Sequence, residues 1–205
     1  MCSHPKQASG FTLLELIVAI SIAGILMAMA IPSFSDMMRN NRLTTYANEL
    51  VTALNLARSE AVKRGVPVTV RKISAAGIGT YWSTLGWNVF VDTNGNGTLD
   101  TATDPTEIIL RTYDKLPNNF SLIGNGNVFR DRVTYQADGT TNNISGTFAL
   151  CNISDGNGIP PKPYTSKLII ISPVGRIRMG KDSDNDGIPE KDSSLSTELT
   201  DCTSP

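Results

Sequence analysis

The feature that most restricts this fold is a nearly continuous apolar run, residues 11–34, that carries a single charged side chain, Glu15. Residues 16–30 hold no charge, and the run is long enough to cross a hydrocarbon core about 30 Å thick. A carboxylate at the centre of a membrane helix costs roughly 2.5–3.5 kcal/mol on insertion scales. Glu15 therefore either stays at the headgroup level or meets a compensating positive charge.

A secretory signal peptide is the alternative interpretation of this segment, because Ala28-Met29-Ala30 has the small-x-small pattern of a cleavage site. The apolar run is long for such a signal, contains Glu15 and continues into further helical sequence. These features favour a segment that stays on the mature protein.

Residues 10–15, GFTLLE, resemble the leader motif of type IV pilins and type II secretion pseudopilins. In that family a prepilin peptidase cleaves after the glycine and the new N-terminal residue is N-methylated, which the resemblance places at Gly10 and Phe11. It also implies that residues 1–10 are a leader and that Glu15 pairs with the Phe11 amine of a neighbouring subunit. A carboxylate in an apolar bundle persists where such a charge compensates it.

The sequence after the apolar run predicts that the same helix continues to Arg64. Pro32 lacks an amide proton and its ring clashes with the preceding turn, so a kink is expected there. Residues 35–65 are amphipathic, and Gly65 followed by Pro67 is a typical helix end. The apolar side chains on one face recur every three or four residues: Leu43, Tyr46, Ala47, Leu50, Val51, Leu54, Ala57 and Ala61.

Beyond Gly65 the apolar period shortens toward two residues, which is typical of strands. Residues 66–205 are therefore expected to form an antiparallel β domain with one face on the helix, which gives an α+β fold. The predicted strands are 66–73, 87–92, 107–113, 128–135, 147–151, 167–172 and 174–179.

Three segments resemble the GspH/FimT family of minor pilins and pseudopilins, and the layout is most similar to its FimU-like members. They are ARSEAVKRG at 57–65, GWNVFVD at 86–92 and SPVGRIR at 172–178. The resemblance covers most of the chain and is weakest at 114–166 and in the tail. It implies a pilin fold, with residues 11–34 as the membrane or filament stem.

Cysteine and histidine usage limits the chemistry of the chain. It has three cysteines and one histidine, and Cys2 and His4 fall in the predicted leader. An even pair, Cys151 and Cys202, then remains, which in an exported chain predicts a disulfide. Without a histidine the mature chain lacks a histidine base, a Cys–His pair and the usual zinc ligand sets, so no enzyme is expected.

Two loops have the alternating oxygen side chains and the glycine bend of calcium sites, although neither has the closing glutamate of an EF-hand. For the first, an Asn-Gly turn without an ion is the favoured interpretation. The second resembles thrombospondin type 3 calcium motifs, and calcium and a solvated acidic tail are equally supported there. No cofactor is required otherwise. The first loop contains Asp92, Asn94, Asn96 and Asp100, and the second Asp182, Asp184, Asp186, Glu190 and Asp192.

Arg176 and Arg178 would share one face of a strand about 6.6–6.8 Å apart, a spacing that can span successive phosphates of a nucleic acid. This pattern resembles the Gly-Arg-x-Arg element that some FimT-type pilins use to bind DNA during natural transformation. Lys181 would reinforce such a DNA contact. The favoured interpretation is an edge strand protected by charges. The acids from Asp182 onward would repel phosphate, and a net charge of -1 gives no general support for nucleic-acid binding.

The resemblance as a whole implies a minor pilin that helps to initiate a type IV pilus and links other minor pilins at its tip to the major pilin. The expected location is the bacterial inner membrane, with a single span and a periplasmic domain, and then the pilus at the cell surface. Two alternatives stay open: a DNA-binding minor pilin for DNA uptake, and a minor pseudopilin of a type II secretion system.

Overall fold

The computed structural model describes residues 11–74, 81–154, 161–191 and 198–202, without the side chains of residues 29–33, 35 and 36. The chain divides into two compact units, 1–39 and 40–205, and helix α1 (Leu13–Arg64) contributes to both. The helix ends where the sequence predicts. Gly65 has a φ of 69°, and its amide donates to the Ala61 carbonyl at 2.9 Å, as a glycine at the C′ position does.

The second unit contains two four-stranded antiparallel sheets, with strand orders β3-β2-β1-β5 and β4-β6-β7-β8. The predicted α+β class is confirmed. The strands are β1 Val68–Lys72, β2 Trp87–Val91, β3 Ile109–Tyr113, β4 Phe120–Gly124, β5 Arg132–Tyr135, β6 Gly146–Asn152, β7 Ser166–Ile171 and β8 Ile177–Met179.

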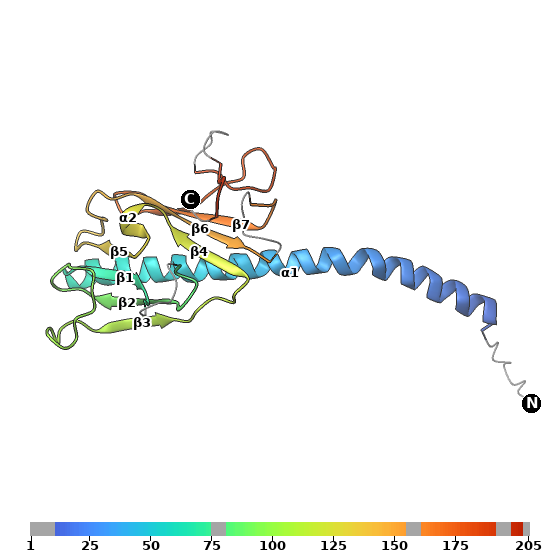
Figure 1. Ribbon diagram of the computed structural model, residues 1–205, viewed down its shortest axis with the longest axis horizontal. Coiled ribbons are helices and arrows are strands. Elements are labelled where there is room, and N and C mark those ends of the chain that lie inside the picture. The colour runs from blue at the N-terminus through green and yellow to red at the C-terminus, as the bar shows by residue number, and fades with distance from the viewer. Residues whose placement is uncertain (1–10, 75–80, 155–160, 192–197, 203–205) are drawn as a thin grey trace, which may run out of the picture. The chain divides into compact units, whose positions relative to one another are not determined.

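One hydrophobic core joins both sheets to the C-terminal half of α1, which runs past their strands in Figure 1. Most of the helix positions predicted to face the domain are fully buried, whereas Tyr46 and Val51 are only partly buried. Alanines occupy several of the buried helix positions, so strands can approach the helix axis closely and leave room for large rings. The fully buried aromatic residues of the core are Trp82, Trp87, Tyr135 and Phe148.

The strand predictions are confirmed to within three residues at each end, with two exceptions. The predicted strand 128–135 is wrong in its first half, where helix α2 (Gly126–Phe129) forms and turns the Phe129 carbonyl toward the buried indole of Trp82, 3.1 Å away. β4 was not predicted. All five of its residues are buried, so it lacks the alternation that marks a strand with one wet face.

Candidate functional site

The described N-terminal segment begins with a capped helix end. The Thr12 Oγ1 accepts a hydrogen bond from the Glu15 amide at 3.2 Å, which makes Thr12 the N-cap of α1. The Thr-x-x-Glu spacing is that of a capping box, and a carboxylate in the first turn is favoured by the positive end of the helix dipole. The sequence prediction gave Thr12 no role, although this spacing could have revealed one.

The stem, residues 11–34, leaves its described apolar side chains exposed. Their exposed fractions in residues 11–27 run from 48% for Val18 to 86% for Phe11, and Glu15 is exposed among them. In the parts of the chain that the structure describes, no helix meets the length and hydropathy expected of a membrane span. The predicted membrane span is thus not confirmed. Apolar surface this continuous still indicates an interaction with lipid or with other apolar helices.

Two predictions for the stem stay untested. Gly10 and the rest of the predicted leader, residues 1–10, lie outside the described residues, so the cleavage position is not seen. The backbone at Pro32 belongs to α1, but its side chain is not described, and the predicted kink stays a prediction.

The predicted disulfide between Cys151 and Cys202 is present, with Cα atoms 6.1 Å apart. Cys151 lies on β6, where successive side chains point to opposite faces of the sheet. Phe148 and Leu150 face the main core, whereas Cys151 joins a smaller cluster on the other face with Leu168 and the tail residue Leu199. The bridge therefore fastens the C-terminal tail to the second sheet.

The predicted DNA-binding residues lie at the edge of the second sheet. β8 is its last strand, and Arg176, Arg178 and Lys181 are all exposed there. The Arg178 guanidinium donates to the Lys191 carbonyl, and Lys181 forms a β-bridge with Glu190. The three cations are thus next to the second acidic loop, as the sequence predicted, and DNA binding stays a prediction.

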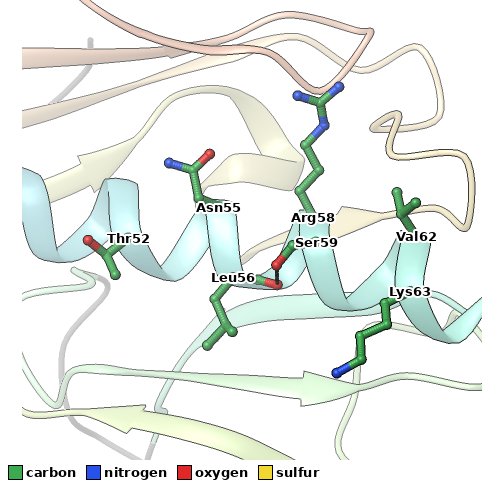
Figure 2. A pocket seen from close by; sticks show the side chains of 7 residues that line it. All are labelled: Thr52, Asn55, Leu56, Arg58, Ser59, Val62 and Lys63. Atoms are coloured by element: carbon green, nitrogen blue, oxygen red, sulfur yellow. Dashed lines mark hydrogen bonds between the residues drawn. The ribbon is translucent and has the colours of Figure 1, made fainter.

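A DNA-binding role for this edge is not needed to explain its packing, because Arg58 of α1 contacts it directly. Figure 2 shows Arg58 projecting from the helix on the side away from Leu56. Its Nε donates to the Gly139 carbonyl at 3.0 Å and its Nη2 to the Val174 carbonyl at 3.1 Å. Sequence reasoning missed this contact, which joins the helix to two turns far along the chain.

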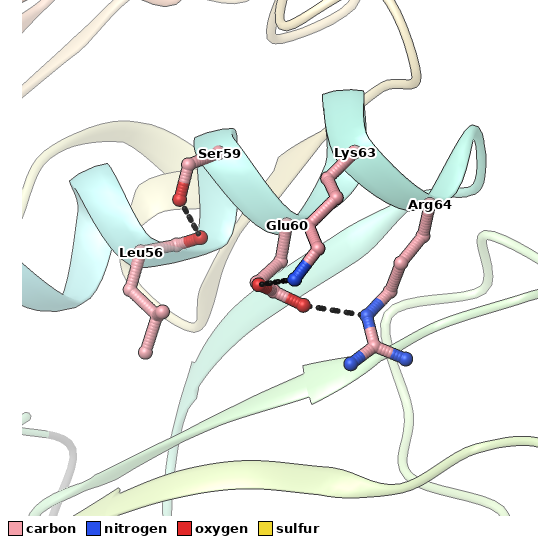
Figure 3. A network of polar contacts seen from close by, with 5 residues as sticks. All are labelled: Leu56, Ser59, Glu60, Lys63 and Arg64. Atoms are coloured by element: carbon pink, nitrogen blue, oxygen red, sulfur yellow. Dashed lines mark hydrogen bonds and ion pairs between the residues drawn. The ribbon is translucent and has the colours of Figure 1, made fainter.

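The last turns of α1 carry a local ion-pair network, drawn in Figure 3. The Glu60 carboxylate lies 2.6 Å from the Arg64 Nε and 3.5 Å from the Lys63 ammonium. The hydrogen bond from Arg64 and the nearby charge of Lys63 lower the pKa of Glu60 below its usual range. Ion pairs between residues three and four positions apart stabilise the last turns of the helix. The negative end of the helix dipole also favours cations there.

The second acidic loop brings three of its predicted ligands together. Carboxylate oxygens of Asp182, Asp184 and Glu190 lie within 4.8 Å of one another. The Asp182 Oδ2 accepts from the Gly187 amide at 3.0 Å, and Glu190, 1% exposed, accepts from the Ser183 amide. Asp186 lies in the loop outside that group, and Asp192 lies outside the described residues. Calcium binding there stays a prediction.

The first acidic loop repeats the same pattern of backbone-to-side-chain hydrogen bonds. The Asp92 Oδ2 accepts from the Gly97 amide and the Asn94 Oδ1 from the Asn96 amide, both at 2.9 Å. The Asn96 Nδ2 donates to the Asp100 Oδ2 at 2.6 Å. A fifth residue belongs to this loop that the sequence prediction missed, because the Glu107 Oε2 accepts from the Asp100 amide at 2.7 Å.

Comparison with known protein families decides the affiliation of this fold. The family model described as Type II transport protein GspH matches residues 46–175, more than half of the chain. The chain belongs to the GspH family. A second model, the prokaryotic N-terminal methylation motif, matches residues 5–31, which contain the GFTLLE segment. The resemblance to minor pilins and pseudopilins is therefore confirmed.

Individual relatives of this GspH-family chain carry pilin-like or fimbrial names. It is 31% identical over 165 residues to the pilin-like protein PilA1 of Thermus thermophilus. This match covers 80% of this chain and 86% of the relative. It is 40% identical over 60 residues to a fimbrial protein of Pseudomonas aeruginosa, a match that covers 29% of this chain and 38% of that protein.

Two solved structures of the type IV minor pilin FimU of Pseudomonas aeruginosa have the same fold. One crystal form superposes with a TM-score of 0.54 at 23% identity, and the match covers 79% of this chain and 96% of the FimU chain in that structure. The other gives a TM-score of 0.52 at 22% identity, with 78% and 99% covered. The GspH family is one of structural pilin-like proteins rather than of enzymes, in keeping with the expectation from the sequence.

Proposed function

We propose that this GspH-family chain is a minor pilin of a type IV pilus, which helps to initiate assembly and connects other minor pilins at the tip to the major pilin. The observation that carries the proposal is the stem: a capped helix with exposed apolar side chains and the carboxylate of Glu15, inside a methylation motif. The fold shared with the minor pilin FimU supports the same role.

The chemistry of the stem suggests how the subunit enters a filament. Prepilin peptidase removes residues 1–10, and the inner membrane holds the apolar helix until assembly. The Glu15 carboxylate then attracts the Phe11 amine of a neighbouring subunit while the apolar side chains pack against other stems. This exchange of lipid for helix neighbours covers the exposed apolar surface throughout.

Mass spectrometry of the native protein tests the processing step. We expect a mature chain that starts at an N-methylated Phe11. A chain that starts at Ile31 would indicate a secretory signal peptide, and an intact Met1 would indicate no processing; either result contradicts the proposal.

Deletion of the gene in its source bacterium tests the assembly role. We expect few or no pili by electron microscopy, restored by the wild-type gene. Normal piliation with lost DNA uptake would favour the exposed Arg176 and Arg178 as a DNA site. Normal piliation with lost protein secretion would favour a type II pseudopilin, in line with the description of the matched family.

A further inference from the structure

Two buried carboxylates lie opposite each other where the hairpin of β2 and β3 opens into its loop. The Val91 amide donates to the Ile108 carbonyl at 3.0 Å, and continuing this pairing by one residue places Asp92 opposite Glu107. Asp92 is 0% exposed and Glu107 is 1% exposed. Like charges at facing positions destabilise a sheet, and burial away from water increases the cost, unless something compensates them.

Each carboxylate uses one oxygen and leaves the other without a partner. The Asp92 Oδ2 accepts from the Gly97 amide at 2.9 Å and the Thr69 hydroxyl at 2.6 Å, and the Glu107 Oε2 accepts from the Asp100 amide. The Asp92 Oδ1 and the Glu107 Oε1 are buried and accept no hydrogen bond from the described residues. The amides of Gly97 and Asp100 thus tie one oxygen of each carboxylate to the loop.

The neighbouring arginines do not neutralise this pair. The Arg71 guanidinium donates to the Gly97 carbonyl at 2.5 Å, and the side chain of Arg132 packs against Gly97. Within the described ranges neither arginine forms an ion pair with Asp92 or Glu107. Neither free oxygen therefore has a cationic partner among the described residues.

We propose that the 92–107 loop binds one calcium ion, with the Asp92 Oδ1 and the Glu107 Oε1 as its two buried ligands. Asn94 and Asn96 alternate along the loop and offer further side-chain oxygens. Calcium accepts six to eight oxygen ligands in a flexible geometry, whereas magnesium requires a strict octahedron, so this mixed set favours calcium. Glu107 replaces the closing glutamate of an EF-hand, from later in the chain. The inference is independent of the role in a pilus.

Calcium titration of the full-length protein in detergent tests this site. The second acidic loop is first disabled by Asp182→Asn with Asp184→Asn, two of its three clustered carboxylates, so that any remaining site belongs to the 92–107 loop. In this background we expect isothermal titration with calcium chloride to show one ion per chain. Glu107→Gln and Asp92→Asn should each weaken binding by at least about tenfold, since loss of even a supporting group near a metal costs that much.

A matched control removes a different carboxylate from the same loop. Asp104 is bonded to Thr93 and Thr106 and has no buried unpartnered oxygen. Asp104→Asn should therefore leave calcium affinity within about twofold, because it removes only a solvent-screened charge. Equal weakening by Asp104→Asn and Glu107→Gln would mean general attraction of cations to an acidic loop and would overturn the proposal.

Thermal unfolding separates ligation from a purely structural role of Glu107. The parent protein here is the variant in which only the second acidic loop is disabled. In chelator, the melting temperature of Glu107→Gln should equal or exceed that of the parent, because the substitution relieves the repulsion with Asp92. In millimolar calcium the parent should gain stability and Glu107→Gln should not. Absence of calcium binding by the parent at millimolar concentration, or an unchanged calcium gain in a destabilised Glu107→Gln, would overturn the proposal.

Discussion

At Gly175 the edge of the second sheet lies very close to the turn that contains Gly139. Its φ is 75°, and a Cβ placed there would lie 2.0 Å from the Gly139 carbonyl oxygen and 3.2 Å from the Arg58 Nε. That same carbonyl accepts the Arg58 hydrogen bond, so it cannot move away freely. The glycine that precedes Arg176 is thus explained by packing alone, whatever the arginines bind.

Gly175→Ala should consequently destabilise the domain through strain and steric overlap together. A left-handed conformation costs a non-glycine residue about 1–2 kcal/mol, and displacing a bonded carbonyl adds to that. Gly65→Ala is the matched control, because Gly65 has a φ of 69° and nothing within 4 Å of an added Cβ. Urea unfolding should show the larger loss for Gly175→Ala, and equal losses would contradict the close approach.

Glu49 provides a pH-dependent prediction. Burial raises the pKa of its carboxyl above the usual value, Arg111 opposes the rise, and Asp114 adds to it. The folded protein therefore holds the Glu49 proton more tightly than the unfolded chain, so this stabilising contribution is lost as the pH rises through the raised pKa. Glu49→Gln should be more stable than the wild type at pH 7 by roughly a few tenths of a kcal/mol, since Glu49 is only partly buried and solvent screens its charge.

Unfolding curves measured from neutral to acidic pH check this prediction for Glu49. The difference between Glu49→Gln and the wild type should shrink below the usual glutamate pKa, where both side chains are neutral. A constant difference across that range would mean that lost packing, rather than ionisation, causes it.

At the scale of elements, local signals predicted those parts whose neighbours are close in sequence. The end of α1 followed from Gly65 and Pro67, and the strands β7 and β8 followed from the residue patterns at 167–172 and 174–179. β4 gave no alternating signal because both of its faces are buried. The sequence prediction missed Glu107 because its position opposite Asp92 depends on the pairing register of β2 with β3. Residue spacing within the loop does not encode that register.

The disulfide is the element-scale link whose energy can be estimated. It joins β6 to the tail across a sequence separation of 51 residues. In the chain-entropy model a closed loop of this size contributes about 4 kcal/mol, less any strain. Cys151→Ala with Cys202→Ala should lower the free energy of unfolding by about that amount, measured in urea.

Reduction of the wild type is the control for this double variant. Wild type with reductant should unfold near the variant, and reductant should not affect the variant itself. A loss below about 1 kcal/mol would mean that the packing of Leu199 and its neighbours, without the covalent bond, holds the tail in place.

At the scale of the whole molecule, the chain combines a domain that buries its own core with a stem whose described apolar side chains are exposed. The domain contains both sheets and the disulfide, so it can hold its structure without covering the stem. Exposed apolar helices are stable only with lipid or other helices around them. A subunit that moves from membrane to filament meets both conditions in turn.

Substitution of Glu15 distinguishes a simple membrane anchor from a filament subunit. If its carboxylate pairs with a Phe11 amine inside a packed bundle, Glu15→Ala leaves that amine without a partner, which costs about 3 kcal/mol or more and should lower incorporation into pili at least about tenfold. Thr12→Ala is the matched control, because it removes the N-cap bond to Glu15 but keeps the charge, at a cost of about 1 kcal/mol to the helix. Immunoblots of sheared pili and of membranes measure both variants. Normal incorporation of Glu15→Ala, or an equal loss in Thr12→Ala, would mean that Glu15 serves the helix start and not the contact between subunits.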